Sequence, residues 1–93
     1  MNWHPITLKL DAARLNERQE AFAFLREAFE LPETLPDNLD ALSDSLSEIP
    51  DEICIFSDRK NLIQICENKF SWTILRILVR AADENPHIHI RLS

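Results

Sequence analysis

The sequence predicts a small α/β fold in which helices pack on a three-stranded parallel sheet. Two segments, near the two ends of the chain, alternate apolar and polar residues, and a third segment near the middle is continuously apolar. Two helical patterns lie in each gap between these segments, and parallel strands need long crossover connections of this kind. We therefore expect the order β-α-α-β-α-α-β, with about four helices, in a single domain over residues 1–93.

The first strand and first helix follow from local patterns. Residues 6–10 alternate apolar and polar side chains, which predicts a strand with one buried face. Asn16 and Gln19 have the spacing of a capping box, which predicts that a helix begins there. Pro32 ends that helix because it lacks a backbone N–H. The helix carries three residues at helical spacing that we expect in the core: Phe22, Leu25 and Phe29.

A loop and a short second helix come next. Residues 31–36 contain two prolines and predict a loop, after which Asp37 or Asn38 caps a helix that runs to about Leu46 or Ser47. One side of this helix is apolar and consists of Leu39, Leu42 and Leu46. The opposite side is acidic and consists of Asp37, Asp40, Asp44 and Glu48.

The second half of the chain repeats the pattern. Residues 53–56 are continuously apolar and predict a fully buried, central strand, and Asp58 then caps a third helix. The fourth helix is the longest and stops at Asn85–Pro86. We expect its apolar face to hold Leu75, Leu78, Val79 and Ala82. In the last strand we expect three residues to point inward: Ile88, Ile90 and Leu92.

Composition excludes several classes of function. The chain has no glycine, so it lacks the P-loop, the dinucleotide fingerprint and the nucleophile elbow, and we expect no nucleotide cofactor. Cys54 and Cys66 have no metal-ligand spacing and are interpreted as reduced core thiols. Without a long apolar segment or a basic, apolar N-terminus, we expect a cytoplasmic protein that does not bind membranes.

Charge is unevenly distributed along the chain. Residues 27–52 hold nine acidic residues and no Lys or Arg, whereas the rest holds seven acidic and all ten basic residues. The negative electric field of such an acidic segment repels nucleic acid and attracts a basic protein surface. The helix dipole accounts for acids at the start of the second helix, but not for Asp44 and Glu48 near its end. Because Asp40 and Asp44 also repel each other at i and i+4, the stripe indicates a binding surface.

The same segment carries a family resemblance. Leu31-Pro32-Glu33, then Asn38-Leu39-Asp40-Ala41-Leu42, and then Asp44 and Leu46 resemble the barstar family of intracellular ribonuclease inhibitors. The similarity resumes at the C-terminal Ile88–Ser93 and covers the chain from about Leu25 onward. The resemblance implies a barstar fold whose second helix binds the ribonuclease. It also implies that Asp40 and Asp44 face the enzyme, with Asp44 in the place of an RNA phosphate.

Several positions differ from the family pattern. Thr34, Leu35 and Ser43 stand where the family has aromatic contacts, and the segment Ser47–Pro50 is short and lacks Gly-Trp. Arg80 replaces a third acidic contact, where it would either repel a cationic nuclease or pair with the protein's own acidic helix. We therefore expect a cognate, basic secreted or toxin ribonuclease other than barnase as the partner.

The predicted function is that of an immunity or antitoxin-type inhibitor, monomeric when free, and not an enzyme. The predicted partner-binding residues are Asp40, Asp44, Asp37, Asn38, Thr34, Ser43 and Glu48. An alternative partner is another basic protein, such as a DNase toxin or a regulatory factor, because an acidic patch does not identify the cation it meets. An acid and base pair formed by Asp40 and Asp44 is disfavoured because both project from an exposed helix face.

The sequence also supports expectations for six other residues. His87 and His89 share a strand face but have no evident third ligand, so we expect no metal. Phe70 and Trp72 are expected in the core. For Trp3 and His4 the sequence leaves two alternatives open, packing on the sheet or remaining disordered.

Overall fold

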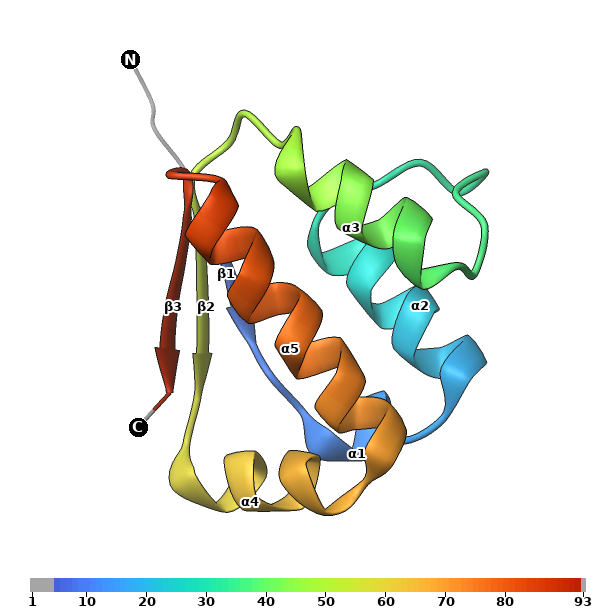
Figure 1. The fold of residues 1–93 in the computed structure, drawn as a ribbon, viewed down its shortest axis with the longest axis vertical. Helices are drawn as coiled ribbons and strands as arrows, with labels where there is room; N and C mark the ends of the chain where they lie inside the picture. The colour runs from blue at the N-terminus through green and yellow to red at the C-terminus, as the bar shows by residue number, and fades with distance from the viewer. Residues whose placement is uncertain (1–4, 93) are drawn as a thin grey trace.

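The computed structural model describes residues 5–92, so Trp3 and His4 lie outside the described residues. Figure 1 shows three strands side by side with helices packed against them. The strands and helices are, in chain order, β1 (Ile6–Lys9), α1 (Ala12–Leu15), α2 (Arg18–Ala28), α3 (Leu39–Ser47), β2 (Ile53–Ser57), α4 (Arg59–Glu67), α5 (Lys69–Glu84) and β3 (Ile88–Leu92).

The sheet has the order β1-β2-β3, and both pairs of strands are parallel. Ile53 in the central strand lies opposite Ile6 on one side and Ile88 on the other. The predicted α/β class, parallel sheet and order of the main elements are confirmed. The one-turn helix α1, capped by Asp11, is an addition that was not predicted. The predicted cap of α2 at Asn16 is wrong, because the side chain of Glu17 accepts the N–H groups of Gln19 and Glu20.

The hydrophobic core lies between the sheet and the helices. In Figure 1, α2, α3 and α5 all lie on the same side of the three strands. Phe22, Leu25 and Phe29 of α2 are buried as predicted, as are Leu42 and Leu46 of α3. Leu39 is half-buried against the same core. Helices on one side of the sheet leave the other side of its strands in contact with solvent.

The prediction that β2 is fully buried is therefore wrong, because helices cover only one face of the sheet. Cys54 and Phe56 of β2 are exposed, because their side chains alternate with the buried Ile53 and Ile55 and point away from the helices. Cys54 is therefore not a core thiol. Cys66 is also exposed, because α4 buries only Ile65.

The buried stripe of α5 is rotated from the predicted one. Its buried members are Ser71, Ile74, Leu75, Leu78 and Ala81. This stripe places Trp72 and Val79 on the flank of the helix, where they are 43% and 41% exposed, so both were wrongly expected in the core. Phe70 is half-buried, and its ring lies 6.4 Å from that of Phe22. In β3, Ile88 is buried as predicted, whereas Leu92 is 36% exposed at the end of the strand.

Candidate functional site

Helix α3 begins at a side-chain cap. Oδ1 of Asn38 accepts the backbone N–H groups of Asp40 at 2.8 Å and of Ala41 at 3.2 Å. These donors belong to the first turn and have no partner within the helix, so the cap satisfies them. Of the two capping residues that the sequence allowed, the structure therefore selects Asn38, whose amide oxygen is occupied within the chain.

The C-terminal end of α3 is held by Asn85, a side chain from the far end of α5. Its Nδ2 donates to the backbone carbonyls of Leu46 and Ile49, both at 3.0 Å, and its Oδ1 accepts the N–H of His87 at 2.9 Å. Asn85 is only 3% exposed. The sequence indicated Asn85 only as the end of a helix, because its 36-residue separation from Ile49 leaves no local signal.

The loop before α3 is held by two arginines of α2. Nη1 of Arg26 donates to the carbonyl of Leu35 at 3.0 Å and to Oδ1 of Asp37 at 2.5 Å. Nη2 of Arg18 donates to the Asp37 carbonyl at 2.6 Å. The Asp37 carboxylate, predicted as part of the binding surface, is therefore engaged in an internal ion pair. The ion pair between Arg26 and Asp37 lies just before α3 and can fix the start of that helix.

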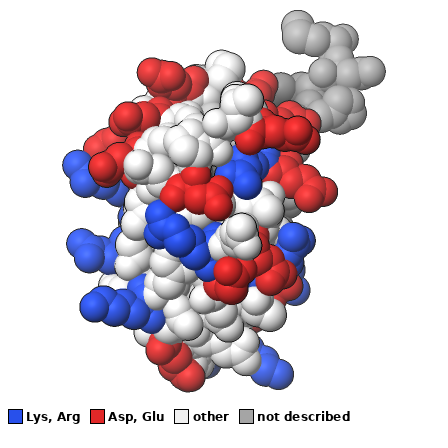
Figure 2. All heavy atoms as spheres, turned by 90° about the vertical axis from the view of Figure 1, so that its right-hand side faces the viewer, with Lys and Arg blue, Asp and Glu red and all other residues white. Residues whose placement is uncertain are grey.

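The remaining acids of α3 face solvent. Asp40, Asp44 and Glu48 are exposed at successive intervals of four residues, which places them along one side of the helix. Among the ion pairs of residues 5–92, none includes any of these three. Figure 2 shows acidic side chains gathered over the upper part of the face that α2 and α3 form. Thr34 is exposed and Ser43 is half-buried.

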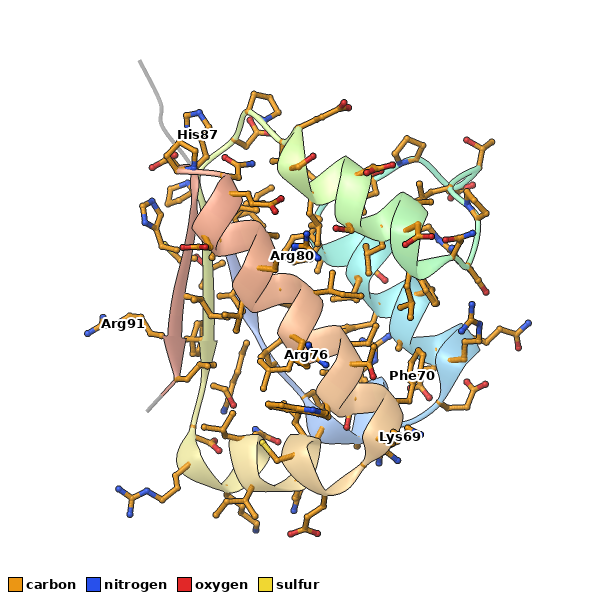
Figure 3. All side chains as sticks on the ribbon, in the orientation of Figure 1. Lys69, Phe70, Arg76, Arg80, His87 and Arg91 are labelled. Carbon is orange, nitrogen blue, oxygen red and sulfur yellow. The ribbon has the colours of Figure 1, made fainter. Side chains whose placement is uncertain are left out.

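Arg80 does not neutralise this acidic surface. Its Nε lies 3.2 Å from Oε1 of Glu84, one turn further along the same helix. Its side chain is 76% exposed. Arg80 therefore does not pair with the acidic helix, which was one of the two roles that the sequence suggested for it. Figure 3 shows Arg76 and Arg80 both projecting from α5, the helix next to α3.

The shifted titrating groups lie elsewhere in the fold. Oε2 of Glu52 is 2.6 Å from Nδ1 of His87, and its Oε1 is 3.1 Å from Nε2 of His89. Hydrogen bonding to His89, and then to His87, lowers the pKa of the Glu52 carboxyl. The backbone N–H of Asn61, helped by Lys9, likewise lowers the pKa of Asp58. Within residues 5–92, no group of three or more His, Cys, Asp and Glu side chains is arranged to hold a metal.

The sequence model of the family described as Barstar (barnase inhibitor) matches residues 6–92. The chain belongs to the barstar family. The match includes every strand and helix of the fold, and with them α3 and both of its anchors. Proteins of this family are inhibitors and not enzymes. A search among curated proteins finds no match for the chain. In the part of the chain that the structure describes, no helix has the length and apolar character needed to cross a membrane.

Proposed function

We propose that the chain inhibits a basic ribonuclease by placing the acidic side of α3 in its active site. One observation carries the proposal: in a barstar-family chain, the unpaired carboxylates of Asp40 and Asp44 project from a helix that is fixed at both ends. Fixed carboxylates lose little conformational freedom on binding, so more of the interaction energy contributes to affinity.

The chemistry of the two surfaces is complementary. A ribonuclease stabilises the charged phosphate of RNA with Arg, Lys and His side chains, which form a cationic cleft. A carboxylate accepts charge-assisted hydrogen bonds from the same donors. Asp44 takes the place of the phosphate and Asp40 lies one turn before it. Glu48, Ser43 and Thr34 form the surrounding contacts, whereas Asp37 and Asn38 hold the helix in position.

The partner is a cognate secreted or toxin ribonuclease that differs from barnase. Large aromatic side chains usually dominate protein interfaces, and Thr34 and Ser43 do not supply them. Arg80 also adds a positive charge to the helix beside α3. A nuclease that fits this surface has a cationic cleft with a small, polar margin. The inhibitor acts as an immunity protein in the cytoplasm, where it is monomeric until the enzyme appears.

The test is a titration of the ribonuclease encoded beside this chain, with RNA cleavage as the readout. Cleavage is expected to fall linearly to zero at one equivalent. Asp44→Ala should raise the dissociation constant at least about thirtyfold, since removal of one partner of a buried charge pair costs about 2–5 kcal/mol.

The matched control is Asp83→Ala, which removes one exposed carboxylate from α5 and changes the net charge equally. It should change the dissociation constant less than about threefold, because exposed charges away from an interface act only through screened, long-range attraction. Full cleavage in the presence of excess wild-type protein would contradict a ribonuclease partner. Equal losses for the two variants would contradict the assignment of the site to α3.

A further inference from the structure

Within residues 5–92, strand β3 pairs only with β2 and forms one edge of the sheet. The N–H of Ile53 donates to the carbonyl of His87 at 2.9 Å. In a parallel ladder, alternate residues of a strand bond to the same neighbour, so the peptide groups of His89 and Arg91 also face β2. The peptide groups of Ile90 and Leu92 consequently point outward, where they can bond to a further strand.

A groove of about 740 Å³ runs beside this edge, between α5 and β3. Its lining includes Trp72 and Val79 from the helix and Leu92 from the strand. These are three of the five large apolar side chains that are exposed among the described residues, and the other two lie elsewhere. No residue of α3 lines the groove, so it is separate from the acidic surface.

The charges around the edge are mainly positive. Arg76 and Arg80 line the groove together with one acid, Asp83, and Arg80 is paired with Glu84. Figure 3 shows Arg91 extending from β3 on the side away from the helices. Within residues 5–92, no ion pair includes Arg76 or Arg91. A strand added at this edge would therefore meet a free guanidinium on each of its two faces.

This charge pattern disfavours a second copy of the chain as the occupant. If β3 paired antiparallel with its own copy around Ile90, the two α5 helices would lie on the same side of the joined sheet. Such a pairing would bring the arginines of two α5 helices toward each other. Like charges that face each other are destabilising, whereas the carboxylates of an acidic partner would meet Arg76 and Arg80 with opposite charge.

We propose that the edge of β3 and the groove beside it bind an extended, acidic segment of another protein by strand addition. The backbone of the segment pairs with Ile90 and Leu92, as in other complexes formed at sheet edges. Its apolar side chains enter the groove against Trp72 and Val79, and its carboxylates meet Arg76 and Arg91. This binding is independent of the nuclease, because the two surfaces share no residue.

The probe is a library of random twelve-residue peptides displayed on phage and selected against the full chain. Selected peptides are expected to alternate apolar and acidic residues. Added to the 15N-labelled protein, a synthetic selected peptide should shift the amide signals of Ile90 and Leu92 and the indole signal of Trp72. Arg76→Glu should weaken its binding about tenfold, the size of one lost charge contact.

Lys69→Glu is the matched control, because it reverses a charge at the start of the same helix and does not line the groove. It should change peptide affinity less than about twofold. If Arg76→Glu unfolds the protein, Arg76→Gln replaces it as the variant that removes the charge contact with the peptide. Selection without enrichment of acidic residues, or equal effects of the Arg76 and Lys69 variants, would overturn the proposal. So would sedimentation as a dimer in which the Leu92 amide is protected, because a second copy would then occupy the groove.

Discussion

Helices α3 and α5 contact each other, yet they differ in charge, length and role. Helix α3 has nine residues, and its acids form no ion pair within residues 5–92, whereas α5 has sixteen residues and carries Lys69, Arg76 and Arg80. Helix α5 buries a continuous stripe that reaches the sheet and thus contributes to the core. The difference is what the proposed function requires: α5 supplies much of the core, and α3 presents exposed carboxylates to the nuclease.

The exposed side of α3 is not built for the stability of α3 itself. A helix of nine residues is too short to be stable alone, and carboxylates at i and i+4 repel each other by about 0.2–0.5 kcal/mol. Its two buried leucines and the side chains of Asn38 and Asn85 hold it in place. Variants of the two helices and of these anchors can therefore separate binding from stability.

The largest expected effect comes from reversing charge on the two helices in turn. Asp40→Lys places a cation opposite a cationic cleft, and we expect it to abolish measurable inhibition, a loss of more than about 4 kcal/mol. Arg80→Glu should instead leave inhibition intact and speed association a few-fold, because it extends the acidic field. Stopped-flow association and RNA cleavage measure the two outcomes. Slower association by Arg80→Glu would mean that the partner presents an acid to α5.

The next largest effect concerns the anchor that joins the two helices. Asn85→Ala leaves the carbonyls of Leu46 and Ile49 without their donor in a buried position, and should lower the free energy of unfolding by about 3 kcal/mol. Urea denaturation measures this change. The control is Asn16→Ala, an exposed asparagine for which we expect less than about 0.5 kcal/mol. Similar losses for both variants would show that the Asn85 contacts do not stabilise the protein.

A smaller effect is expected at the other end of α3. Asn38→Ala removes the N-cap and should cost about 1 kcal/mol of stability, whereas Asn38→Ser, which keeps a capping oxygen, should cost little. Both substitutions leave the carboxylates in place. Thermal unfolding distinguishes them, and a loss of equal size in the Ser variant would contradict a role in capping.

The smallest effect is a dependence of stability on pH that arises away from both helices. Because the pKa of Glu52 is lowered in the folded protein, its contribution is present above the ordinary glutamate pKa of about 4.3 and is lost as the pH falls below it. Glu52→Gln should therefore flatten the decline in stability between about pH 5 and pH 3. Asp51→Asn, its exposed neighbour, should leave that decline unchanged. Identical curves for wild type and Glu52→Gln would contradict this assignment.

Local patterns were sufficient to predict the strands, the main helices and the two sides of α3. Periodicity in the sequence reports which residues share a face, so the burial of Leu42 and Leu46 followed directly. The exposure of Cys54 and Phe56 could not be predicted in this way. A continuously apolar strand looks the same whether helices cover one side of the sheet or both.

Contacts distant in sequence were also beyond prediction. Two such contacts are the hydrogen bonds from Asn85 to α3 and the ion pair between Asp37 and Arg26. Both depend on how the helices pack, which no short motif encodes. The position of Trp72 depended on a small rotation of α5 around its axis. These differences change which residues act directly: Asp40 and Asp44 remain in the candidate site, whereas Asp37 and Asn38 support it.

In the proposed complex, the acidic side of α3 occupies the place of RNA in the active site of a ribonuclease. The most direct test measures initial rates of RNA cleavage at a fixed concentration of this protein and increasing concentrations of RNA. We expect competitive inhibition, with the apparent inhibition constant rising in proportion to the RNA concentration once that concentration exceeds the KM. An apparent inhibition constant that does not change with RNA concentration would place the contact outside the active site and contradict the proposed binding of α3 there.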